Sequence, residues 1–248
     1  MKLARLTRTT AACIAVLAAM TANASVVITG TRVIYPASER EVTVKLNNDG
    51  KVPALVQTWI DDGDESVDAQ KRAMPFSLTP PVFRLDPDKG QTLRLAYTHD
   101  PLPDDRESVY WLNVLEIPPR AKAEDARNVL QMAFRSRIKI FYRPAGLQGD
   151  ANDAPRSVTW TLAPSKDGKH VVVRADNPTP YNVNVAKASV TVSGKAYDSQ
   201  GGMIPPRGSH EFVLDDLHGT PSTLTPIRYE TVNDYGAIVP AVYPPDSK

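Results

Sequence analysis

Residues that could do chemistry are few in this sequence, and their spacing fits no familiar catalytic or metal-binding pattern. No Gly-x-Ser-x-Gly nucleophile elbow, phosphate-binding P-loop or Gly-x-Gly-x-x-Gly motif occurs. The four histidines show no His-Glu-x-x-His or similar ligand spacing; they are His99, His170, His210 and His218. We therefore predict that the chain is not an enzyme and that it holds no cofactor or metal.

Two groups of carboxylates offer weak alternatives. The acidic segment DDGDE at 61–65 lacks the spacing and the distal glutamate of a calcium loop, so we expect a solvated turn there. Asp104, Asp105 and Glu107 could include the carboxylate pair of a glycosidase, but a sequence does not give the distance between two carboxyl groups.

The first 24 residues have the order of a secretory signal. Three basic residues precede an apolar run at 11–20, and the small-residue sequence ANA follows at 22–24. The run is too short to span a bilayer as a helix. We predict that residues 1–24 are a signal peptide and that the mature chain starts at Ser25. We expect that chain to lie in the periplasm and not to be embedded in the membrane.

Removal of this signal changes the charge and the cysteine content. It takes away three of the 29 basic residues and none of the 28 acidic ones, which leaves a net charge of −2 and gives no case for a nucleic-acid partner. Cys13 is the only cysteine and lies in the signal, so no internal disulfide can form. The fold must then be held by its apolar cores.

Alternation of apolar and polar residues is the main structural signal. It is clear at 41–46 and at 92–97, and the stretch VYWLNVLEI at 109–117 is apolar on both parities, as in a central strand. The 22 prolines cut the chain into short segments and disfavour long helices. Short strands with frequent turns predict an all-β sandwich.

A domain boundary is expected after the pair Arg143-Pro144. A polar segment that contains two glycines follows, and alternation resumes at Val158, Trp160 and Leu162. We predict an N-terminal sandwich at 25–144, a linker at 145–155 and a second β-sandwich at 156–248.

The segment NVLQMAFRSRIKIFY at 128–142 is an unusual strand candidate. Its length of about fifteen residues exceeds the usual five or six. Leu130, Met132 and Phe134 share one parity. From the pattern alone these side chains either fill the core of their own domain or serve a partner.

Eight segments in order are similar to the signature stretches of the periplasmic pilus chaperones of the chaperone–usher pathway, the PapD-like family. They are TRVIY (31–35), LTPPVFRLDP (78–87), DRES (105–108), EIPPR (116–120), NVLQ (128–131), IKIFYRP (138–144), NPTPY (177–181) and NDYG (233–236). The resemblance implies two immunoglobulin-like sandwiches in a boomerang arrangement, with a fimbrial subunit bound in and beside the cleft. The fold of this family is a known example of an immunoglobulin-like sandwich. The donation of a chaperone strand to an incomplete pilin subunit is a known example of β-strand addition.

The resemblance also implies roles for particular residues. Leu130, Met132 and Phe134 would enter the groove of an incomplete subunit, while Arg32 and Lys139 would hold the terminal carboxylate of the subunit. Strict alternation places Lys139 on the face opposite the three anchors. A β-bulge or strong twist at 135–137 would be needed to aim them the same way.

A further set, Glu107, Arg143 and Asp234, matches a family triad that ties the two domains together. The family relationship implies an ATP-independent chaperone that delivers subunits to an outer-membrane usher. The competing interpretation is a secreted fimbrial structural subunit or adhesin. An uncovered strand edge is an aggregation hazard, so a self-capping dimer is a hypothesis for the resting state.

Overall fold

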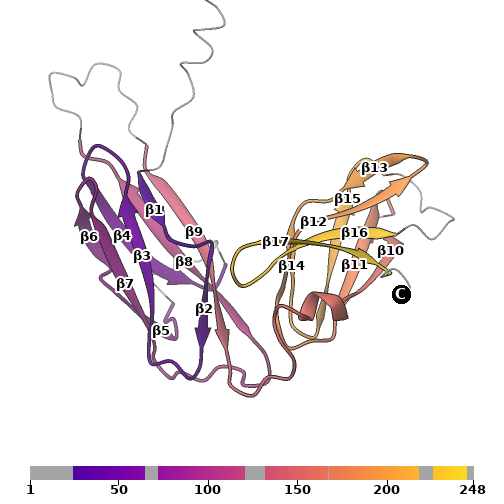
Figure 1. The fold of residues 1–248 in the computed structure, drawn as a ribbon, viewed down its shortest axis with the longest axis horizontal. Coiled ribbons are helices and arrows are strands. Elements are labelled where there is room, and N and C mark those ends of the chain that lie inside the picture. The colour runs from indigo at the N-terminus through magenta and orange to yellow at the C-terminus, as the bar shows by residue number, and fades with distance from the viewer. Residues whose placement is uncertain (1–24, 65–71, 121–131, 167, 218–225, 245–248) are drawn as a thin grey trace, which may run out of the picture.

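The computed structural model describes residues 25–64, 72–120, 132–166, 168–217 and 226–244. The chain forms two β-sandwiches that meet at an angle, with strands β1 to β9 in the first and β10 to β17 in the second (Figure 1). The predicted all-β class and the pair of immunoglobulin-like sandwiches in a boomerang are confirmed. The one helical element of the described chain is a short 3-10 turn, η2, at Ala154–Ser157.

The first sandwich packs a four-stranded sheet on a five-stranded sheet. The smaller sheet has the order β1 (Val26–Ile28), β3 (Val42–Asn48), β7 (Gly90–Tyr97) and β5 (Phe76–Thr79). The larger has the order β2 (Arg32–Pro36), β9 (Phe134–Arg143), β8 (Ser108–Ile117), β4 (Ala54–Asp61) and β6 (Val82–Leu85). Alternate apolar residues of both sheets fill one core, among them Leu46, Val56, Leu93, Leu112 and Ile140.

The second sandwich is built from a three-stranded and a five-stranded sheet. The smaller has the order β10 (Thr159–Pro164), β11 (Val171–Asn177) and β15 (Gly208–Leu214). The larger has the order β13 (Lys195–Asp198), β12 (Val183–Val192), β16 (Ile227–Val232) and β17 (Ile238–Tyr243), with β14 (Gly202–Ile204) also paired to β12. Its separate core includes Trp160, stacked between Phe212 and Tyr229.

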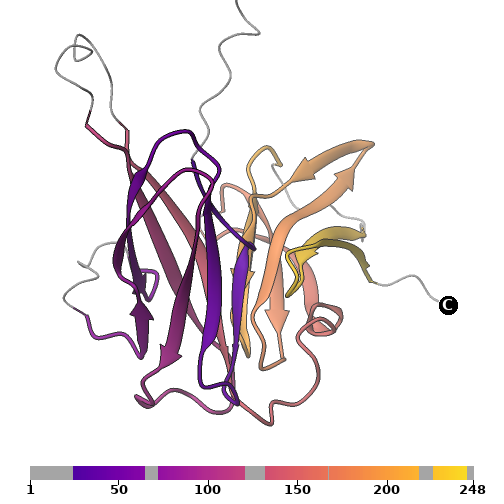
Figure 2. The same ribbon diagram turned by 60° about the vertical axis from the view of Figure 1, so that its left-hand side comes forward.

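The two sandwiches approach each other at a second place besides the chain connection. The chain passes from β9 to the second sandwich at one end of the molecule, as both views show (Figures 1 and 2). The β16–β17 hairpin extends back toward the first sandwich (Figure 1). At Gly236 in this hairpin, an added Cβ would lie only 2.5 Å from the Thr31 hydroxyl, so the hairpin touches the chain just before β2.

The strand predicted over 128–142 is shorter in the structure. Met132 and Ala133 have no strand structure, β9 begins at Phe134, and Leu130 lies outside the described residues. The pairing of β8 with β9 ends at Glu116 and Phe134 because β8 stops at Ile117 before two prolines, which lack the N–H that a ladder needs. The expected length is therefore wrong for the described part.

The bulge considered at 135–137 is absent. The β8–β9 register runs without a shift from Phe134 to Tyr142. Ile138, Ile140 and Tyr142 face the core, and the odd-numbered residues face the other way. Lys139 therefore lies on the face opposite Phe134, as strict alternation predicts.

Candidate functional site

Arg143, at the end of β9, lies between two acidic residues from different sandwiches. Its Nε donates to Glu107 Oε1 at 2.7 Å, and its Nη1 and Nη2 donate to the two carboxylate oxygens of Asp234 at 2.8 and 3.1 Å. The Glu107 side chain is only 2% exposed, whereas those of Arg143 and Asp234 are 23% and 22% exposed. The structure thus brings the three residues of the predicted triad into one ion network.

Local turns hold the two carboxylates in place. The second oxygen of Glu107 accepts the Asn182 backbone N–H at 2.9 Å, and the Glu107 N–H donates to Pro180 O at 2.9 Å. The side chain of Asn177 fixes this turn by donating to Tyr181 O at 2.7 Å. Asp234 sits in the β16–β17 turn, which Gly236 closes with a φ of +82°.

The charge of Arg143 is secured by these partners. Burial lowers the pKa of Arg143, but the hydrogen bonds and charges of Asp234 and Glu107 raise it more, so its pKa lies above the ordinary arginine value. The guanidinium also lies over the Tyr181 ring, 5.4 Å from its centroid. Arg143 is therefore charged at any physiological pH.

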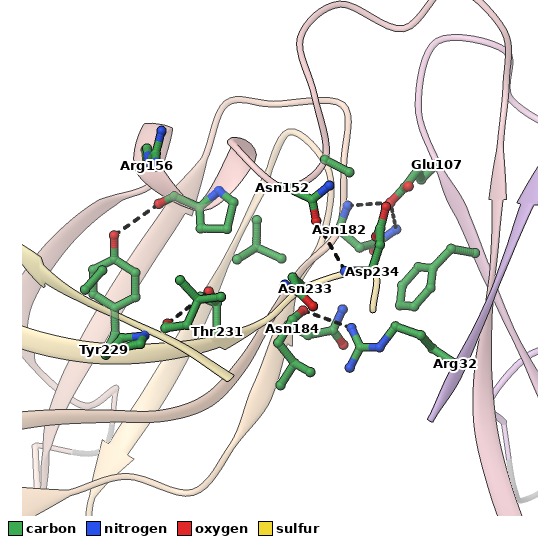
Figure 3. Close-up of a pocket in the computed structure, with 18 residues that line it drawn as sticks. Arg32, Glu107, Asn152, Arg156, Asn182, Asn184, Tyr229, Thr231, Asn233 and Asp234 are labelled. Atoms are coloured by element: carbon green, nitrogen blue, oxygen red, sulfur yellow. Dashed lines mark hydrogen bonds between the residues drawn. The ribbon is translucent and has the colours of Figure 1, made fainter. Parts of the chain in front are cut away.

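Arg32 and Lys139 lie side by side. Strands β2 and β9 are parallel, and these two residues are paired in the register. Arg32 Nη1 donates to Val232 O at 2.9 Å, and Lys139 Nζ donates to Asn184 Oδ1 at 2.5 Å, so each reaches a neutral acceptor in the second sandwich. Figure 3 shows Arg32 pointing from β2 toward Asn184 and Asn233.

These two cations are partly desolvated, and neither makes an ion pair within the described residues. Burial, and secondarily the charge of Arg32, lower the pKa of Lys139 to about 8. Burial also lowers the pKa of Arg32, against a smaller opposite effect of Asp234. Two adjacent positive groups whose hydrogen-bond partners among the described residues are neutral can accept an anion.

The next cations along β9 are neutralised differently. Arg137 and Arg135 share Asp61, with nitrogen–oxygen distances of 2.6 and 3.3 Å, and Asn113 Nδ2 donates to the same carboxylate at 2.7 Å. Asp61 is 5% exposed, so the expectation of a solvated turn is wrong at this residue. Burial raises the pKa of Asp61, but the hydrogen bonds from Asn113, Gly63 and Arg137 outweigh it, so its pKa lies below the ordinary value.

Sequence reasoning did not identify two groups near these cations. Asn184 is the acceptor for Lys139, and Trp111 lies beneath the Lys139 and Arg137 side chains, with ring-centroid distances of 5.3 and 4.6 Å. The alternation of β12 and β8 gives their faces, but no motif marks them as partners of a lysine on another strand.

Of the three expected anchors, two lie in the described chain. Met132 is 47% exposed and precedes β9, and Phe134, at the start of β9, is partly buried. Between Phe134 and Ile138, β9 pairs with β8 on one side, whereas β2 joins its other side only from Lys139 onward. Among the described residues this part of β9 is therefore an unpaired sheet edge, and it leads directly to the two cations.

Comparison with known families identifies the fold. Residues 25–148 match the model "Pili and flagellar-assembly chaperone, PapD N-terminal domain", and residues 153–243 match "Pili assembly chaperone PapD, C-terminal domain". The chain belongs to the pilus assembly chaperone family. This family is not enzymatic, and the prediction that the chain is not an enzyme is confirmed.

Individual family members are similar over most of their length. The chain is 45% identical over 223 residues to the chaperone protein FimB/FhaD of Bordetella pertussis, covering 88% of this chain and 87% of that one. The crystal structure of the YadV chaperone superposes with a TM-score of 0.75 at 40% identity, covering 88% and 98%. The structure of the Salmonella enterica SafB chaperone in complex with SafA pilin superposes with a TM-score of 0.73 at 28% identity. The match covers 90% of this chain and 98% of that one.

The described residues lack two further features. No helix there is long and apolar enough to cross a membrane. No group of three or more His, Cys, Asp or Glu side chains there has a geometry suited to a metal ion.

Proposed function

We propose that this family member is a periplasmic, ATP-independent chaperone that binds fimbrial subunits by donating β9 to an incomplete subunit fold. The observation that carries the proposal is the pair of adjacent cations Arg32 and Lys139. In the part of the chain that the structure describes, they have no carboxylate partner and lie beside an unpaired edge of β9. The similar SafB chaperone is found in complex with SafA pilin, which supports a subunit as the partner.

The free edge accounts for the backbone part of the interaction. An extended subunit strand can add to β9 between Phe134 and Ile138, where no described strand pairs with the N–H and C=O groups on one side. Leu130, Met132 and Phe134 are proposed to fill the subunit groove. Burial of three such side chains contributes roughly 5–9 kcal/mol before the cost of association.

The two cations, Arg32 and Lys139, account for the register in which the subunit strand pairs with β9. A subunit that ends in a free carboxylate places two oxygens within reach of a guanidinium and an ammonium, and charge-assisted hydrogen bonds contribute about 1.5–3 kcal/mol each. Such a carboxylate replaces the neutral acceptors Val232 O and Asn184 Oδ1. Fixing the carboxylate fixes which subunit residues face each anchor.

We expect Met132→Asp to weaken subunit binding about tenfold to a hundredfold, because the anchor loses about 1.5–3 kcal/mol of burial. Titration of a purified subunit measures the change. The control is Val213→Asp, which places the same charge at another exposed apolar residue, on β15 of the second sandwich. Equal binding by the Met132 variant and wild type would count against the donor role.

We expect subunit binding to weaken about tenfold between pH 7 and pH 9. Only the ammonium form of Lys139 binds a carboxylate, and its pKa of about 8 makes this form scarce at pH 9. Lys139→Arg keeps its charge throughout and should bind without this dependence. Identical pH profiles for the two proteins would remove Lys139 from the clamp.

The lowered pKa of Lys139 has the opposite consequence for the stability of the free protein, which should rise with pH. The pKa of Lys139 is about 8 in the fold and 10.5 in its absence, so burial of the charge opposes folding below pH 8. This penalty is relieved as the pH rises from 8 toward 10.5.

Delivery to an outer-membrane usher, and release when the extension of the next subunit replaces β9, complete the proposed function. The competing role is that of a fimbrial structural subunit or adhesin. Cell fractionation separates them. A chain recovered free in the periplasm supports the chaperone, and recovery in sheared fibres supports the subunit.

Before a subunit arrives, a second copy of the chain is the proposed cover for the β9 edge. Two edges that pair hide their unpaired backbone groups. Sedimentation velocity should then show a fraction of dimer that increases with protein concentration. A monomer at every concentration would reject this resting state.

A further inference from the structure

Glu116 is a buried carboxylate in the apolar core of the first sandwich. On β8 it shares its parity with Leu112 and Val114, both core residues, and it is 8% exposed. A carboxylate in such a place is unfavourable unless strong donors surround it. Its partners therefore identify what the site is built to hold.

Those partners are the first described residues of the chain. The backbone nitrogens of Ser25 and Val26 donate to Glu116 Oε2 at 3.0 and 2.9 Å, and the Ser25 hydroxyl donates to Oε1. Within the described residues, every hydrogen bond on this carboxylate comes from Ser25 or Val26. Since β8 and β1 belong to opposite sheets, Glu116 fastens the first strand of one sheet to the other.

The position of Ser25 is fixed from two more sides. Its carbonyl oxygen accepts the Asp49 N–H at 2.8 Å. A Cβ added at Gly50 would lie 2.3 Å from the Ser25 Cβ, so a side chain there would displace Ser25. The nitrogen of Ser25 is thus held on Glu116 by contacts on both sides of the residue.

The sequence predicts that Ser25 becomes the first residue of the mature chain. In that step a signal endopeptidase adds water across the Ala24–Ser25 peptide bond: the carboxylate stays on Ala24, and the Ser25 nitrogen becomes a primary amine that is protonated at neutral pH. The neutral amide beside Glu116 is replaced by a cation with three donors.

We propose that Glu116 is the receptor for the α-ammonium group that cleavage creates at Ser25. Cleavage then converts a neutral hydrogen bond into a buried ion pair and locks β1 onto the sandwich, so the processed chain is more stable than its precursor. This site lies apart from Arg32 and Lys139 and does not depend on subunit binding.

The test compares chains that start at Ser25 with chains that retain Ala24, each with Glu116 and with Glu116→Gln. Glutamine keeps the shape and an acceptor oxygen but removes the charge. With Glu116, we expect the chain that starts at Ser25 to melt several degrees higher than the chain that starts at Ala24. With Gln at position 116, we expect this difference in melting temperature to vanish. Asp49→Asn is the control, because Asp49 contacts Ser25 through its backbone N–H, which the substitution keeps while it removes a charge. This variant should leave the difference intact.

A second readout uses the wild-type chain alone. The pKa of the Ser25 α-amino group, followed by NMR after isotopic labelling, should lie at least one unit above the ordinary 7.7–8.0. A raised pKa means that the stabilisation is present below about pH 8 and is lost as the pH rises through the folded-state pKa. Three results would each overturn the proposal. They are an ordinary pKa of the α-amino group, equal melting temperatures of the two Glu116 chains that start at Ser25 and at Ala24, and a mass of the periplasmic protein that differs from that of a chain starting at Ser25.

Discussion

Arg143→Ala should lower the free energy of unfolding by about 3 kcal/mol, the largest stability effect we expect from a single surface-accessible residue. The substitution leaves Glu107 charged and 2% exposed without its cation, and removal of one partner of a buried pair is strongly destabilising. Because Asp234 also loses its partner, the contact between the two sandwiches loosens. Chemical denaturation measures the first effect, and small-angle scattering the second.

The matched control for this experiment is Arg174→Ala. Arg174 pairs with Asp176 at 3.0 Å, but the two side chains are 45% and 44% exposed, and exposed pairs of this kind contribute little to stability. We expect this variant to unfold at nearly the same denaturant concentration as wild type. If both variants showed the same small decrease in the free energy of unfolding, the network at Arg143 would stabilise the fold no more than an exposed ion pair does.

Lys139→Met should change binding and stability in opposite directions. Loss of the ammonium should weaken subunit binding at least about thirtyfold, because removing one partner of a buried charged hydrogen bond costs about 2–5 kcal/mol. The free protein should become about 1 kcal/mol more stable, since burial without an anion already depresses the pKa of Lys139. Calorimetric titration and thermal unfolding give the two values.

Lys187→Met separates this result from a general effect of removing a lysine. Lys187 is on β12, is 41% exposed and lies 3.6 Å from Asp198. We expect its loss to leave subunit binding unchanged and to give no gain in stability. A Lys139 variant that bound normally, or that was destabilised like a core substitution, would mean that Lys139 holds the domains together instead of a ligand.

Much of the fold could be predicted from the sequence, because strands of a sandwich have one dry face. The alternation at Val42, Val44 and Leu46 predicts the inward face of β3, and the doubly apolar stretch at 109–117 predicts the central β8. The length of β9 could not be predicted in this way, because it depends on where β8 ends, and that is a property of a different segment.

The site was predicted through family resemblance, and only in part. The resemblance names Arg32, Lys139 and the triad, but not the neutral acceptors on the second sandwich or the burial of Asp61. Those features depend on tertiary contacts between segments far apart in the chain, such as Lys139 with Asn184 and Asp61 with Arg137. Local patterns do not encode such contacts.

The measurement that tests the central proposal most directly is co-purification from the periplasm with the fimbrial subunits of the same cells. Wild type should bring down a subunit one-to-one, whereas Arg32→Ala, which we expect to melt like wild type, should bring down none because its carboxylate clamp is incomplete. If wild type brought down no subunit, or if Arg32→Ala retained one as well as wild type, the proposed carboxylate clamp would be contradicted.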